Sequence, residues 1–273
     1  MFVQRACLMT VALALAFAWG GNDARGEKPN KRQPAPQPAP QPAPPQRAPP
    51  PTVVPCPSAP DMLAIPAGTF RMGTNDGDPD EKPVHAVTVA AFCMDPTEVT
   101  VAAYKGCTSC SAPNTGESCN WGVDGRDNHP INCVDWNQAT AFCTAVGKRL
   151  PTEEEWEYAA RGAAGWKHPW GNTPPSNQLC WARYGDGKPN STCSVGSYPA
   201  GRSPFGLNDM AGNVWEWTSS PYCPYTDPAC SNSARVLRGG CWSSGNPTNV
   251  RGAFRGRSGV GIRLSSLGFR CAR

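Results

Sequence analysis

The sequence predicts an α+β fold with few helices, much irregular structure and many disulfides. The chain holds 14 cysteines among 273 residues. Only two segments show helical periodicity, and beyond residue 163 the chain is rich in Gly, Pro, Asn, Ser and Trp. Irregular chain buries little apolar area, so disulfides, ions or buried hydrogen bonds must hold it in place.

The N-terminal part divides into two segments before the predicted domain of residues 56–273. Residues 1–18 resemble a secretory signal peptide, with Arg5 ahead of an apolar stretch that ends in small residues. Residues 19–55 form a linker in which eleven prolines fall between positions 29 and 51. Proline favours extended polyproline II, so we expect a stiff spacer. Beyond the signal no apolar run reaches the roughly 18 residues of a membrane span, so none is expected in the mature chain.

Within the domain, apolar alternation and turn residues predict two short strands in residues 62–73 and another over 85–89. These strands lie early in the domain, before any helical pattern begins. One α+β domain with few helices is the expected architecture.

Two helices are expected in the middle of the domain. Residues 135–146 place Trp136, Ala139, Cys143 and Val146 on one face. The second helix begins at Thr152, which has capping-box spacing to Glu155, and runs to about Arg161. Trp156 and Ala159 are its expected buried residues.

The charge distribution gives no support to a nucleic-acid role, and no nucleic-acid partner is expected. Residues 1–55 carry six Lys/Arg and two acids, whereas residues 56–273 carry 19 of each sign. The net charge of +4 therefore belongs to the tail, and the folded part offers no basic excess.

The cysteines indicate an oxidising compartment. Thirteen lie beyond the signal, a density typical of disulfide scaffolds in exported proteins. Cys107 and Cys110 form a C-x-x-C pair, but neither a zinc site nor a redox site is supported, because no matching second pair follows. We expect the protein to be secreted, periplasmic or on the cell surface.

Several strings in fixed order carry a resemblance to a known family. They are IPAGTFRMG (65–73), DPTEVT (95–100), GKRLPTEEEWEYAARG (147–162), PWG (169–171), VGSYP (195–199), GLNDMAGNVWEW (206–217), RGG (238–240) and GFRC (268–271). Together they resemble the sulfatase-modifying-factor family, whose best-known member is the formylglycine-generating enzyme. The resemblance covers about residues 60–273. It implies a single domain of the C-type-lectin-like kind.

The resemblance also implies an activity that this chain departs from. The family's enzymes oxidise a protein cysteine to formylglycine with oxygen and a copper(I) ion held by two cysteines. Ser244 and Asn249 occupy those two positions here, and Cys241 falls where the family places a serine. Copper(I) prefers soft thiolates, so we do not expect the copper site. An iron-dependent branch of the family exists, but the three histidines (His85, His129 and His168) show no ligand spacing, and we do not expect non-haem iron.

Calcium is the metal that the resemblance favours. The family binds it through positions that are Asp209, Gly212, Val214 and Glu216 in this chain. Carboxylates and backbone carbonyls on a tight loop suit this hard ion. The alternative is a hydrogen-bonded turn with Glu216 paired to an arginine. A second family calcium site has Cys180 at its first position, where the family has an asparagine.

The resemblance pairs Cys143 with Cys271. Short loops suggest Cys180 with Cys193 and Cys223 with Cys230. Three more disulfides are expected in an order that the sequence leaves open, among Cys56, Cys93, Cys107, Cys110, Cys119 and Cys133. Thirteen is an odd number, and Cys241 is the hypothesised remaining thiol.

Arginines and tryptophans each allow two interpretations. The arginines near the C-terminus either pair with buried acids or line a groove for an anionic peptide or glycan; they are Arg251, Arg255, Arg257, Arg263 and Arg270. Most tryptophans fall in the family strings and are expected in the core, rather than on a carbohydrate-stacking surface.

These observations favour an exported accessory module that binds an envelope or secreted protein, peptide or glycan without copper catalysis. One alternative is a formylglycine-generating-type oxidoreductase acting on a protein cysteine, with Cys241 as its reactive group. Another is a structural component of the cell envelope.

Overall fold

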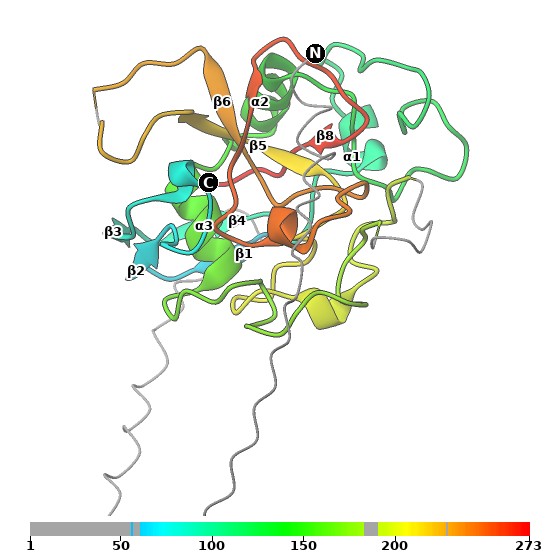
Figure 1. The fold of residues 1–273 in the computed structure, drawn as a ribbon. Helices are drawn as coiled ribbons and strands as arrows, with labels where there is room; N and C mark the ends of the chain where they lie inside the picture. The colour runs from blue at the N-terminus through cyan, green and yellow to red at the C-terminus, as the bar shows by residue number, and fades with distance from the viewer. Residues whose placement is uncertain (1–55, 57–60, 183–190, 228) are drawn as a thin grey trace, which may run out of the picture. The chain divides into compact units, whose positions relative to one another are not determined.

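The computed structural model describes residues 56, 61–182, 191–227 and 229–273 (Figure 1). The predicted signal peptide and linker, residues 1–18 and 19–55, lie outside this part. The α+β prediction is confirmed, since short strands and helices are separated by long irregular segments. In the described part of the chain, no helix has the length and apolar character needed to cross a membrane.

The elements are β1 (Leu63–Ile65), β2 (Gly68–Met72), η1 (Pro79–Glu81), β3 (His85–Val89), β4 (Phe92–Met94), α1 (Val101–Lys105), α2 (Trp136–Ala145), α3 (Glu153–Arg161), η2 (Pro199–Gly201), β5 (Trp215–Pro221), β6 (Ala234–Arg238), η3 (Pro247–Val250), β7 (Gly256–Gly259) and β8 (Leu267–Gly268).

The strands form two antiparallel pairs and one four-stranded sheet. The predicted strands of residues 62–73 are β1 and β2, and each pairs with a later strand rather than with the other: β1 with β4 and β2 with β3. The larger sheet has the order β7-β6-β5-β8. Only its β5–β8 pair is parallel among these pairings.

Both predicted helices are confirmed, and their first turns are capped by side chains. The Thr152 hydroxyl accepts from the backbone N–H of Glu155, whose carboxylate accepts from the N–H of Thr152. Asp135 and Gln138 make the same reciprocal pair at the start of α2. Of the residues placed on one face of α2, Ala139 and Cys143 are buried, whereas Val146 is 45% exposed. Val146 is the C-cap, where the backbone leaves the helix and the periodicity of the face ends.

Helix α3 is central to the core. It contacts β2 and β3 on one side and β5 and β6 on the other (Figure 1). Trp156 of α3 and Trp217 of β5 are both fully buried, so the expectation of core tryptophans holds for them. Of the other tryptophans, Trp181 and Trp215 are buried, and Trp136 and Trp242 are half-buried.

The C-terminal residues close the core by joining two distant parts of the chain. Cys93 of β4 exchanges backbone hydrogen bonds with Arg273, and Arg149 exchanges them with Ala272. The segment after β8 therefore lies between β4 and the chain that enters α3. The C-terminal residues are therefore far from α3 in sequence but lie beside the segment that leads into it.

Six disulfides join the described cysteines. The pairing that the resemblance implied is present, and so are both short-loop pairs: Cys143–Cys271, Cys180–Cys193 and Cys223–Cys230. The order left open by the sequence is Cys56–Cys93, Cys107–Cys110 and Cys119–Cys133. Cys241 is buried and takes part in none of these six. The C-x-x-C pair is thus a local disulfide.

The Cys143–Cys271 disulfide should make the largest single contribution of the six to cross-linking stability, because it closes the longest loop, of 128 residues. Replacing both cysteines by alanine should lower the free energy of unfolding by roughly 4–5 kcal/mol through loop-closure entropy. The matched control is Cys107→Ala with Cys110→Ala, where the separation is 3 and the same model gives roughly 2 kcal/mol. Denaturant unfolding measures both, and equal losses would contradict the account.

Candidate functional site

The segment after β6 holds Cys241, Ser244 and Asn249, the three positions that the resemblance assigns to the copper site. It forms a loop that is held by its own hydrogen bonds. Cys241 and Ser244 are both fully buried, and Asn249 is 6% exposed. The Cys241 N–H donates to the Ser244 hydroxyl at 3.0 Å, and the Ser244 N–H donates back to the Cys241 carbonyl at 2.9 Å. The Cys241 Sγ lies 3.3 Å from the Ser243 hydroxyl and 3.5 Å from that of Ser244.

Two features hold this loop in its place. The N–H of Trp242 donates to the Asn213 carbonyl at 2.7 Å, and the Trp242 carbonyl accepts from Ala182 at 2.6 Å. Gly240 has φ of 75°, and a Cβ there would lie 2.6 Å from the Asn249 carbonyl oxygen. Only glycine allows this close approach of the two ends of the loop.

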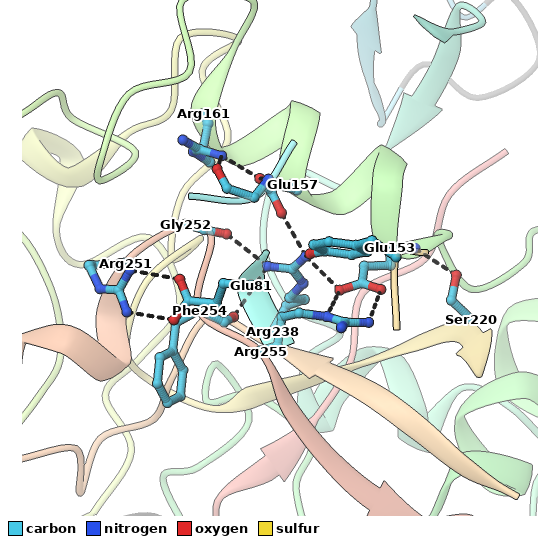
Figure 2. A network of polar contacts seen from close by, with 12 residues as sticks. Glu81, Glu153, Glu157, Arg161, Ser220, Arg238, Arg251, Gly252, Phe254 and Arg255 are labelled. Atoms are coloured by element: carbon cyan, nitrogen blue, oxygen red, sulfur yellow. Dashed lines mark hydrogen bonds and ion pairs between the residues drawn. The ribbon is translucent and has the colours of Figure 1, made fainter. Parts of the chain in front are cut away.

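A buried network of charges fixes the strand that leads into the loop (Figure 2). Arg238 is fully buried, and its Nη2 donates to Glu153 at 2.6 Å and to Glu157 at 2.7 Å. Its Nη1 donates to the carbonyls of Gly252 and Phe254. Burial disfavours the charged guanidinium, but the two carboxylates outweigh it and raise the pKa of Arg238 well above its ordinary value.

Neighbouring arginines complete the network. Arg255 donates to both oxygens of Glu153, Arg161 pairs with Glu157, and Arg251 makes a bidentate pair with Glu81 (Figure 2). The structural interpretation of the C-terminal arginines therefore holds for Arg251 and Arg255. It holds also for Arg270 and Arg263, which pair with Glu216 and Asp135. Arg257 is exposed and stacks on Tyr222 at 4.8 Å.

The predicted calcium positions lie on a tight loop between residue 209 and β5. Asp209 adopts φ of 56° and Gly212 φ of 80°, and a Cβ on Gly212 would meet the Cys180 carbonyl at 2.4 Å. The Asp209 Oδ2 accepts from the Gly196 N–H at 2.6 Å. Glu216 is fully buried and its oxygens accept from Arg270 Nε and Nη2, each at 2.7 Å, and from the Trp156 indole at 2.8 Å. The alternative interpretation of Glu216, pairing with an arginine, is thus observed.

Glu98 is a residue of this site that the sequence analysis missed. It is 1% exposed, and neither carboxylate oxygen has a hydrogen-bond partner. Burial first, and then the Asp209 carboxylate, raises the pKa of Glu98 well above its usual range. The only signal in the sequence was its place in the string DPTEVT, between the β-branched residues Thr97 and Val99.

The oxygens of this cluster are chemically suited to a hard cation. Glu98, Asp209 and Glu216 bring three carboxylates together with one guanidinium, that of Arg270, within mutual electrostatic influence. A cation would offset the excess of negative charge and give the Glu98 oxygens a partner. Within the described ranges, no group of three or more His, Cys, Asp or Glu side chains has the arrangement of a metal site. Any cation there would therefore need backbone carbonyls such as those of Gly212 and Val214.

The remaining metal-related positions are held by other contacts. Cys180, at the second family calcium position, is bonded to Cys193. His168 is buried, stacks on Trp170 and contacts the Val250 carbonyl through Nδ1 at 3.1 Å. His129 contacts Thr192, and His85 contacts the Pro83 carbonyl.

The ordered motifs, the disulfide-held α+β fold and the loop after β6 define a domain of the sulfatase-modifying-factor class. A family model described as the sulfatase-modifying factor enzyme 1-like domain matches residues 48–273. The chain belongs to this family.

Relatives of different activity are equally similar to this chain. The inactive C-alpha-formylglycine-generating enzyme 2 of Bos taurus is 33% identical, with 78% of this chain and 87% of that protein covered. The formylglycine-generating enzyme of Streptomyces coelicolor is also 33% identical, with 77% and 88% covered. The chain spans only 39% of the length of the serine/threonine-protein kinase Pkn1 of Chlamydia trachomatis, with which it shares 33% identity over 81% of its own length.

The fold has a counterpart among solved structures. PvdO from Pseudomonas aeruginosa superposes with a TM-score of 0.67 and 28% identity, covering 83% of this chain and 99% of that one. The expected C-type-lectin-like fold of this family is therefore confirmed. Identity alone does not separate active from inactive members, so the side chains of the site must do so.

The Arg238 network predicts a large effect of a single substitution. Arg238→Met should lower the free energy of unfolding by roughly 3–5 kcal/mol, because Glu153 and Glu157 would each lose one of two buried guanidinium partners, and the carbonyls of Gly252 and Phe254 would lose their donor. Lys105→Met is the control, since the exposed Lys105–Asp127 pair should contribute about 1 kcal/mol or less. Chemical denaturation measures both, and a loss below that of the control would refute the role of the network.

Proposed function

We propose that this domain is an exported binding or accessory module that acts on an envelope or secreted protein, peptide or glycan without copper catalysis. One observation carries the proposal: the two copper-ligand positions hold Ser244 and Asn249, inside a loop that satisfies its own polar groups. A hydroxyl and an amide are poor ligands for copper(I), which selects soft sulfur donors.

Export is supported by the disulfides. Six disulfides in one domain are typical of proteins that fold in an oxidising compartment, and reducing cytosol would not keep them. The same compartment suits a module whose partners are secreted or envelope molecules. The oxidoreductase alternative would need Cys241 to meet a substrate thiol, and its side chain is fully buried.

Copper binding tests the proposal. The parent chain should not retain copper(I) against a competing thiol chelator, and it should form no aldehyde on a cysteine-containing peptide in the presence of oxygen. Ser244→Cys with Asn249→Cys restores two sulfur donors at the family positions and should gain stoichiometric copper(I), because soft thiolates supply its preferred ligands. Tight copper(I) binding or aldehyde formation by the parent would overturn the proposal, whatever the variant does.

We also propose that a calcium ion supports the loop of residues 209–216. Asp209, with the carbonyls of Gly212 and Val214, would hold the ion, and Glu98 would supply the buried carboxylate oxygens that lack a partner. Glu216 would act mainly through its pair with Arg270, on the other side of the cluster. Bound calcium would supply positive charge that stabilises the loop, with no part in catalysis.

Calcium should therefore raise the unfolding temperature of the metal-free chain, whereas magnesium at the same concentration should have a smaller effect. At about 100 times the dissociation constant, calcium should add roughly 2.7 kcal/mol to the free energy of unfolding. Glu98→Gln and Asp209→Asn should lose this increment, and asparagine is chosen at 209 because it tolerates positive φ. Glu117→Gln, at an exposed position, is the control. A chain that calcium does not stabilise, or a Glu98→Gln variant with the full response, would contradict this assignment.

A further inference from the structure

The turn of residues 126–129 and the segment of residues 191–196 are distant in sequence and lie side by side in the fold. The Val195 N–H donates to the Asn128 carbonyl at 2.9 Å. The half-buried side chain of His129 also reaches from the turn to the segment. These contacts form a junction, and His129 is the group in it whose charge changes near neutral pH.

The partners of His129 determine where the neutral ring carries its hydrogen. Nδ1 lies 3.0 Å from Nη1 of Arg126 and 2.9 Å from the Thr192 hydroxyl. A guanidinium has only donors, so Nδ1 accepts from Arg126 and carries no hydrogen, which is therefore on Nε2. The same Nη1 lies 3.2 Å from the Thr192 carbonyl and 3.3 Å from the Ser191 hydroxyl. Arg126 thus contacts both His129 and the segment of residues 191–196.

Protonation of Nδ1 would bring two positive charges into contact. Thr192 can adapt, because its hydroxyl can accept from Nδ1 as it accepts from the Asn120 amide at 2.9 Å. Arg126 cannot adapt, because a guanidinium neither accepts a hydrogen bond nor loses its charge. Burial first, and then the charge of Arg126, lowers the pKa of His129 below its ordinary value. The joined form therefore favours the neutral ring, and acid favours the separated form.

The other charged groups around the junction do not offset this repulsion. Asp127, in the same turn, pairs with Lys105 of α1 at 2.6 Å. The segment of residues 191–196 has the sequence STCSVG, and its cysteine is held in a disulfide, so it brings no charge. Among the described residues, Arg126 is the charged group that acts on the pKa of His129.

We propose that His129 is a pH-sensitive link between the turn of residues 126–129 and the segment of residues 191–196. Near neutral pH, its unprotonated Nδ1 holds Arg126 against the segment. In acid, the imidazolium repels Arg126, whose contacts to the segment are lost, and the backbone hydrogen bond of Val195 opens. The inference goes beyond the accessory role proposed above and depends on neither the copper nor the calcium assignment.

Hydrogen exchange of the Val195 amide in the full chain tests the link. The buffer contains EDTA, so that metal binding does not contribute. After correction for the intrinsic effect of pH on exchange, the protection of Val195 should fall by about threefold or more between pH 8 and pH 5, where histidine gains its charge. The Ala272 amide, which donates to the Arg149 carbonyl, is the internal control and should keep its protection. Protection of Val195 that is independent of pH, or that falls only together with that of Ala272, overturns the proposal.

Matched variants assign the response to His129. His129→Asn keeps an acceptor near the position of Nδ1 and cannot gain a proton, so the pH response of Val195 should be lost. Arg126→Met removes the like charge, so the response should become smaller and NMR titration should show a higher pKa for His129. His85→Asn is the control and should leave the response unchanged, because His85 lies on β3, where its Nδ1 contacts a backbone carbonyl.

Three results would contradict the role of His129. They are a pH response of Val195 that persists in His129→Asn, an equal loss of that response in His85→Asn, and a pKa of His129 that does not rise in Arg126→Met. The NMR titration measures the repulsion itself, so a variant with a weakened junction still tests the proposal.

Discussion

The pairing of Arg238 with Glu153 and Glu157 is the interaction on which the arrangement of this domain depends. Arg238 is the last residue of β6, and both glutamates belong to α3. Their ion pairs therefore join the large sheet to the central helix. A buried charge needs partners of opposite charge and hydrogen bonds. The Nη2 of Arg238 pairs with the two carboxylates and its Nη1 donates to the carbonyls of Gly252 and Phe254, whereas its buried Nε has no hydrogen-bond partner. The strand, the helix and the chain beyond β6 must therefore assemble together, and the geometry of the loop from Gly239 onward follows from this.

Disulfides and buried ion pairs stabilise the parts of this domain that lie outside helices and strands. The chain after α3 contains few residues in strands, yet its backbone is held by Cys180–Cys193, by the Asn213 contacts and by Arg270 on Glu216. Such interactions are local and directional, and they allow side chains on the loops to vary while the frame is kept. A family with one frame and several activities is the expected result. In this chain the loop after β6 carries a hydroxyl group at Ser244 and an amide group at Asn249, the positions that the resemblance assigns to the copper ligands.

Much of the frame was predictable because its signals are local. The capping box of Thr152 and Glu155, the core position of Trp156 and the short-loop disulfides follow from spacing over a few residues. The Cys143–Cys271 pair required the family resemblance, since no physical rule connects positions 128 apart. Val146 is exposed although the periodicity places it on the same face as Ala139 and Cys143, because periodicity does not show where a helix stops. Glu98 was missed because the sequence does not show whether a buried carboxylate will have a hydrogen-bond partner; that depends on the packing of distant segments.

The central claim is that the loop after β6 is complete without a metal. Hydrogen exchange of the Trp242, Ser244 and Asn249 amides tests this most directly, because each donates a backbone hydrogen bond within or beside the loop. The account predicts slow exchange of all three in metal-free protein, and no change when copper(I) is added. Rapid exchange that becomes slow only with copper(I) would show that the loop needs the bound metal to become ordered, and would contradict the account.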